Sequence, residues 1–85
     1  METVLLETSR RPINTLLRSL RKTVAVKLKN NIEYRGRMIR CDNYMNITLE
    51  GASEFHDSTL IADYGNVFIR GNNILYIKVD VDKLL

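Results

Sequence analysis

The chain has little of the chemistry that enzymes, metal sites and disulfide-rich folds require. Cys41 is the only cysteine and His56 the only histidine among its 85 residues. A single cysteine forms no disulfide within the chain, and no CxxC motif or histidine–cysteine cluster is present to hold a zinc ion. The sequence also has no GxxxxGK[ST], GxGxxG or HExxH motif. We therefore expect no metal site, no cofactor and no catalytic activity.

The residues that could serve catalysis have plainer interpretations. His56 lies in a polar stretch, which is typical of a solvated loop. Cys41 lies at a strand end with no histidine near it in sequence, so a small buried apolar residue is a better interpretation than a nucleophile. Asp80 and Asp82 alternate with valines and indicate a solvated strand face rather than an acid pair.

Targeting and membrane segments are missing as well. The N-terminus lacks an apolar signal core, and no stretch approaches the roughly 20 apolar residues of a membrane helix. We expect a soluble intracellular protein with no membrane partner, cytoplasmic, or nuclear if the source is eukaryotic. No repeat, linker or low-complexity tract divides the chain, so 1–85 is one domain. A domain this small has a thin stability margin, which self-association would widen.

Charge is divided unevenly along the chain. Residues 1–40 hold ten Lys or Arg against three acidic residues, a balance of +7, whereas residues 41–85 hold three against seven, a balance of −4. A basic half favours a polyanionic partner such as nucleic acid. The alternative is that these charges only form solvated faces that keep the protein soluble.

Hydrophobic periodicity predicts a short helix followed by strands. Apolar residues at i, i+3, i+4 and i+7 indicate a helix over 12–22, starting at Pro12. From Thr23 the period becomes two, and Gly36 within a strand predicts a sharp bend. Residues 1–11 are expected to be an extension without a clear period, and 80–85 a C-terminal tail. The expected strands are 23–29, 32–41, 45–50, 60–70 and 74–79, with a polar connection at 51–59.

The last two expected strands are apolar on both faces. In "VFI" at 67–69 and "ILYI" at 74–77, apolar residues do not alternate with polar ones. A sheet with one solvated face does not need apolar residues on both faces. Either another element covers the second face or these strands pair with another chain. The fold class is therefore mainly β, with a short N-terminal helix and a five-stranded, strongly bent, partly open barrel whose edges favour pairing with further subunits.

Two turns carry residue types suited to an unstacked base. Tyr44 and Asn46 lie in "CDNYMN", and Arg70 begins "RGNN". An aromatic ring and a guanidinium can sandwich a base, while a carboxamide can bond to its Watson–Crick edge. The alternative is that Tyr44 caps the core and Arg70 pairs with an acidic residue.

The same residues carry a family resemblance. "VAVKLKNNIEYRGRMIRCDNYMNITLEGASE" (24–54) resembles the first Sm motif, and "NVFIRGNNILYI" (66–77) is similar to the second, which centres on Ile-Arg-Gly. Together they resemble the Sm-like (Lsm) family of the archaeal or eukaryotic type over about residues 12–79. The bacterial Hfq type is less similar, because its Tyr-Lys-His-Ala core is absent.

The resemblance implies a homo-oligomeric ring of six or seven subunits, with seven favoured, in which the fourth strand of one subunit pairs with the fifth of the next. It implies binding of single-stranded, uridine-rich RNA without catalysis, as a scaffold or chaperone in RNA processing or turnover alongside RNA-processing proteins. The alternative is a ring that organises proteins and contacts RNA incidentally. By resemblance Tyr44 stacks on the base, Asn46 reads it, Asp42 orients Asn46, Arg70 stacks on the other face and Gly71 offers a backbone N–H.

Two positions depart from the pattern of many archaeal relatives. Tyr44 stands where they have histidine, so the ring stacks but offers no ring nitrogen. Asn72 stands where they have aspartate, which removes a charge from the expected base or ribose contacts.

Overall fold

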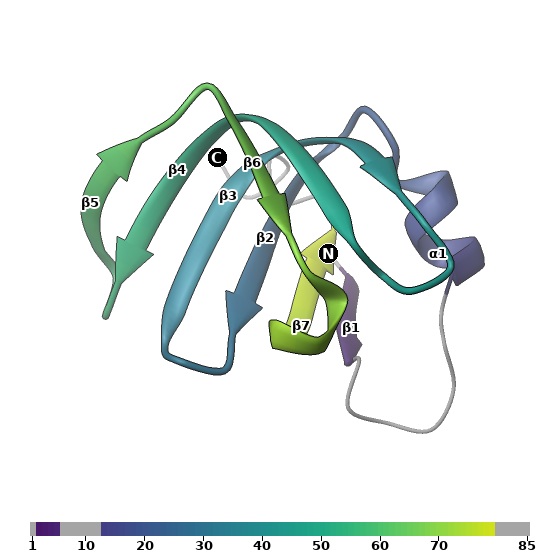
Figure 1. The fold of residues 1–85 in the computed structure, drawn as a ribbon, viewed down its shortest axis with the longest axis horizontal. Helices are drawn as coiled ribbons and strands as arrows, with labels where there is room; N and C mark the ends of the chain where they lie inside the picture. The colour runs from purple at the N-terminus through teal and green to yellow at the C-terminus, as the bar shows by residue number, and fades with distance from the viewer. Residues whose placement is uncertain (1, 6–12, 80–85) are drawn as a thin grey trace.

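The computed structural model describes residues 2–5 and 13–79, which form one short helix and a bent antiparallel sheet (Figure 1). In this view α1 lies at one end of the sheet and β5 at the other. The elements are β1 (Glu2–Leu5), α1 (Ile13–Arg18), β2 (Thr23–Leu28), β3 (Ile32–Cys41), β4 (Ile47–His56), β5 (Thr59–Asp63), β6 (Asn66–Ile69), the 3₁₀ turn η1 (Gly71–Asn73) and β7 (Ile74–Val79).

The strand order β1-β7-β2-β3-β4-β5 leaves β6 beside the first half of β4. Ile47 of β4 pairs with Ile69 of β6, whereas His56 at its other end pairs with Thr59 of β5. A single long strand therefore spans two shorter partners, and the sheet curves between them. The mainly β fold with its short helix and strongly bent sheet is the one that the sequence predicts.

The bend lies where the sequence places Gly36. The β3–β4 register shifts between Arg35 and Arg37. A Cβ at Gly36 would lie 3.1 Å from both the Ala52 Cα and the Glu50 carbonyl oxygen, tighter than ordinary contacts. The absence of a side chain lets β4 lie close to β3 where the sheet bends.

The interior is filled by one apolar cluster from the helix and the strands. Leu16 of α1 is fully buried in this cluster, whereas Leu17, another of the apolar residues that predicted the helix, is 46% exposed. The buried members are Leu16, Val24, Val26, Met38, Met45, Ile47, Leu49, Ala52, Ile69, Ile74, Ile77 and Val79.

The helix is shorter than the prediction of 12–22. It ends at Arg18, and Arg21 adopts a left-handed φ of 69°. The Arg21 N–H donates to the Met38 carbonyl at 2.7 Å, and the Met38 N–H donates to the Lys22 carbonyl at 3.0 Å. These bonds to β3 turn the chain into β2 before another helical turn can form. The predicted start at Pro12 lies outside the described residues, as do the tail at 80–85 and most of the extension.

Two strand predictions need correction. Residues 51–59 are not a polar connection, because β4 continues to His56 and only Asp57 and Ser58, with φ of 51° and 66°, make the turn. Polar side chains are tolerated there because this end of the sheet is solvated. The single strand expected over 60–70 is interrupted at Tyr64 and Gly65, where it follows the bend of β4.

The N-terminal strand β1 was not predicted. Its four residues pair with β7 in an antiparallel register from Glu2 opposite Val79 to Leu5 opposite Tyr76. No hydrophobic period marked these residues, since a four-residue edge strand is too short to show one. None of the described residues form a helix long and apolar enough to cross a membrane.

Candidate nucleic-acid interface

The Asp42 carboxylate organises the loop between β3 and β4. Its Oδ1 accepts backbone N–H groups from Tyr44 at 2.9 Å and Asn46 at 3.0 Å, and its Oδ2 accepts from the Asn46 Nδ2 at 3.1 Å. The Met45 N–H donates to the Asp42 carbonyl at 2.9 Å, and Met45 turns the chain with a φ of 64°. The loop is thus folded around a carboxylate, and β4 begins only at Ile47.

Desolvation alone would raise the pKa of Asp42. The hydrogen bonds from Asn46 and Tyr44 favour the charged form more strongly and hold that pKa below its ordinary value. Asp42 therefore stays ionised at neutral pH and acts only as a hydrogen-bond acceptor.

The Asn46 amide is held in one orientation by partners on both sides. Its Nδ2 donates to Asp42, and its Oδ1 accepts the Gly71 N–H at 2.9 Å. A carboxylate only accepts and a backbone N–H only donates, so a flipped amide would lose both bonds. The bonds leave one N–H and one oxygen lone pair of the amide for a ligand.

Gly71 brings the second turn against the first. A Cβ on Gly71 would lie 2.1 Å from the Tyr44 carbonyl oxygen and 2.9 Å from the Met45 carbonyl carbon. Both contacts are to backbone, which cannot swing away as a flexible side chain can. Only glycine fits, and the close approach brings "CDNYMN" and "RGNN" together.

The side chains around Asn46 face solvent. Tyr44 is 73% exposed, so it does not cap the core. Arg70, which precedes η1, and Asn72 within it are exposed too. Within residues 2–5 and 13–79 the Arg70 guanidinium has no acidic partner. The plainer interpretation of Tyr44 therefore does not describe the site, and no acidic residue in the described part of the chain supports that of Arg70.

A profile of the LSM domain matches residues 14–79. The chain belongs to this family. It is 44% identical over 72 residues to a putative snRNP Sm-like protein of Thermococcus onnurineus, covering 84% of this chain and 92% of the relative. It is 48% identical over 58 residues to the U6 snRNA-associated Sm-like protein LSm6 of Coccidioides immitis, covering 68% and 72%.

Solved Sm structures share the fold of this LSM-domain chain. The Pyrococcus abyssii Sm protein in complex with a uridine heptamer superposes with a TM-score of 0.78 at 40% identity, covering 82% of this chain and 99% of that one. A heptameric archaeal Sm protein superposes with a TM-score of 0.72 at 36% identity, covering 78% and 96%. The resemblance to Sm-like proteins of the archaeal and eukaryotic type is confirmed.

Of the remaining reactive residues of the LSM-domain chain, His56 lies apart from this loop, and Cys41 directly precedes Asp42. His56 ends β4 instead of lying in a loop, and its Nε2 is 3.9 Å from Asp57. Burial, and then the charge of Asp42, raise the pKa of the Cys41 thiol, which disfavours the nucleophilic thiolate. Among the described residues no three His, Cys, Asp or Glu side chains group to hold a metal ion.

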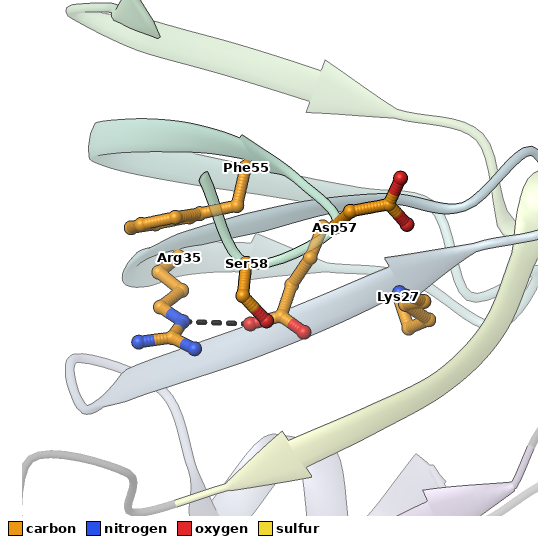
Figure 2. Close-up of a pocket in the computed structure, with 6 residues that line it drawn as sticks. Lys27, Arg35, Phe55, Asp57 and Ser58 are labelled. Carbon is orange, nitrogen blue, oxygen red and sulfur yellow. Dashed lines mark hydrogen bonds and ion pairs between the residues drawn. The ribbon is translucent and has the colours of Figure 1, made fainter. Parts of the chain in front are cut away.

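A shallow pocket at the other end of β3 was missed by sequence reasoning (Figure 2). The Arg35 guanidinium lies over the Phe55 ring at 4.6 Å, and its Nε is 2.6 Å from a Glu33 carboxylate oxygen. Lys27 and Asp57 also line it. The charges compensate one another, and the Arg35–Phe55 contact holds β3 against β4, so the pocket is structural. No motif marked it, because its residues come from three strands.

Proposed function

We propose that this chain forms a homo-oligomeric ring, heptameric rather than hexameric, that binds single-stranded uridine-rich RNA without catalysis. Each subunit accepts one base, and the intracellular ring serves as a scaffold or chaperone in RNA processing or turnover. The observation that carries the proposal is the fixed, partly buried Asn46 amide, which Asp42 and Gly71 orient between turns that expose Tyr44 and Arg70.

Uracil fits the groups that Asn46 has left. Its Watson–Crick edge presents an acceptor, O4, beside a donor, N3–H, which match one amide N–H and one amide oxygen lone pair. In the pose that suits uracil, cytosine and adenine present a donor where uracil has an acceptor and an acceptor where it has a donor, so each would place like groups against the fixed amide and leave them unpaired. Guanine has the same order as uracil but a larger, two-ring base.

Tyr44 and Arg70 supply affinity to this site. An exposed aromatic ring and an exposed guanidinium on adjoining turns can hold a base between them, at about 1–3 kcal/mol per stacked base. Stacking tolerates every base, so these two residues strengthen the binding of any base, while Asn46 selects uracil. Asn72, which follows Gly71, is exposed beside them and contributes no charge.

Ring formation is supported by the apolar surface of β5 and β6. Leu60, Ile61 and Phe68 are 54%, 55% and 63% exposed on strands at one edge of the sheet. Exposed apolar edge strands pair readily with another chain. Of the similar solved proteins, one is a heptamer and another binds a uridine heptamer.

Two measurements on the native protein test the proposal. Light scattering after size-exclusion chromatography is expected to give a particle of seven subunits. Fluorescence anisotropy with four homopolymers is expected to give the highest affinity for oligo(U), falling steeply as salt rises because phosphate binding releases counterions. Rings with no RNA affinity would instead support the protein-assembly alternative, and a monomer at micromolar concentration would overturn the ring.

A further inference from the structure

Strand β1 pairs with an edge of the sheet that the LSM domain, matched over residues 14–79, would leave open. β7 pairs with β2 on one side and with β1 on the other, through four antiparallel pairs that include Thr3 opposite Lys78 and Val4 opposite Ile77. The LSM domain match begins at residue 14, so β1 lies outside the part that this chain shares with its family. Without β1, the outer edge of β7 would carry unpaired N–H and C=O groups.

The β7 edge of the sheet is more buried than the edge formed by β5 and β6. Every β7 residue is buried or partly buried, whereas four of five β5 residues are exposed. Phe68 of β6 is 63% exposed. One edge is thus closed by the chain's own N-terminal strand, and the other is open and apolar. A closed head-to-tail ring needs both edges, because each subunit offers one and accepts the other.

We infer that β1 occupies the β7 edge in the isolated subunit and is displaced from it when a neighbour's strand pairs there in the ring. The inference rests on the proposed ring. Assembly then exchanges β1 for the β6 segment of a neighbour. The two segments are alike: β1 reads Glu-Thr-Val-Leu and β6 reads Asn-Val-Phe-Ile, each a polar residue followed by residues that suit a strand.

The exchange has a physical consequence for assembly. A tethered strand binds its own edge at a high effective concentration, so it protects a dilute subunit from indiscriminate pairing. At higher subunit concentration the exposed apolar residues of β5 and β6 in a neighbouring subunit displace β1. β1 therefore raises the concentration at which rings form.

A reversible disulfide lock tests the exchange directly. Thr3→Cys with Lys78→Cys, in a Cys41→Ser background, places two cysteines opposite each other, and facing Cα atoms of antiparallel strands lie within disulfide range. The oxidised protein is expected to stay monomeric by light scattering and to form rings once reduced. The matched control, Cys41→Ser with Lys78→Cys alone, is expected to form rings in both conditions. Rings of the oxidised lock at the control's concentration would overturn the exchange.

A second variant releases the edge instead of locking it. Thr3→Pro with Val4→Pro removes N–H donors from β1, and Ser9→Pro, outside β1, is the matched control. Loss of about one net hydrogen bond is expected to lower the half-assembly concentration about tenfold. An unchanged or higher concentration would overturn the exchange while leaving the ring intact. If neither wild type nor reduced lock forms rings at any concentration, the proposed ring fails as well.

Discussion

Gly71→Ala is the substitution that the geometry of the two turns opposes most strongly. The added methyl would lie 2.1 Å from the Tyr44 carbonyl oxygen and 3.0 Å from the Met45 Cβ, so one turn has to move. Such overpacking costs about 1–3 kcal/mol of stability. The movement also lengthens the 2.9 Å bond from the Gly71 N–H to the Asn46 Oδ1, which frees the amide to rotate. We therefore expect lower stability together with a weaker preference for uridine.

Urea denaturation and anisotropy with oligo(U) and oligo(C) measure the two effects. Gly65→Ala is the matched control, because a Cβ there meets nothing within 4 Å and neither glycine has a positive φ. That variant is expected to match wild type in stability and base preference. The reasoning is refuted if Gly71→Ala and Gly65→Ala unfold at the same urea concentration.

Three other changes are expected to act on separate properties. Tyr44→Ala should weaken binding to all four homopolymers by about 1–3 kcal/mol per base, and Tyr44→Phe should retain it, because stacking needs only the ring. Replacing the exposed Arg18 and Arg21 with serine should weaken oligo(U) and oligo(A) equally and flatten the salt dependence, because phosphate contacts do not read sequence. Desolvation, then the nearby Glu54 carboxylate, raises the pKa of Tyr34. The protonated phenol thus stabilises the fold below about pH 10, and this contribution should be lost as pH rises through the raised pKa, less so in Tyr34→Phe.

Each expectation has a contrary result. If Tyr44→Ala leaves the affinities for the four homopolymers unchanged, Tyr44 does not stack on the base. Base-dependent losses on replacing Arg18 and Arg21 would show that the helix reads sequence. Thermal melts that fall equally above pH 10 in wild type and Tyr34→Phe would show that this phenol is not responsible.

The parts of the fold that repeat a local pattern could be predicted from sequence. β3 was placed at residues 32–41, where the structure has it, because alternation over ten residues is unambiguous. The bend at Gly36 was placed as well, since a strand glycine without a turn indicates a close approach. The polar end of β4 was missed because its solvated residues look like a loop until their partner strand is known.

The site was predictable in its residues but not in its connections. Tyr44, Asn46 and Arg70 were singled out by residue type. That Asn46 bonds to Asp42 and Gly71 at once depends on a contact between turns 25 residues apart, which no local pattern encodes. The pairing of β1 with β7 depends on a sheet edge that exists only after folding.

The most direct test of the account is the ratio of oligo(U) to oligo(C) affinity in Asn46→Ala, measured by anisotropy on rings of confirmed mass. Oligo(U) and oligo(C) bind to the same altered loop, so any loss of affinity that is independent of the base cancels in the ratio. Because the fixed amide pairs with uracil and opposes cytosine, the ratio is expected to fall from well above one in wild type to about one. A ratio that stays at the wild-type value would show that Asn46 does not read the base.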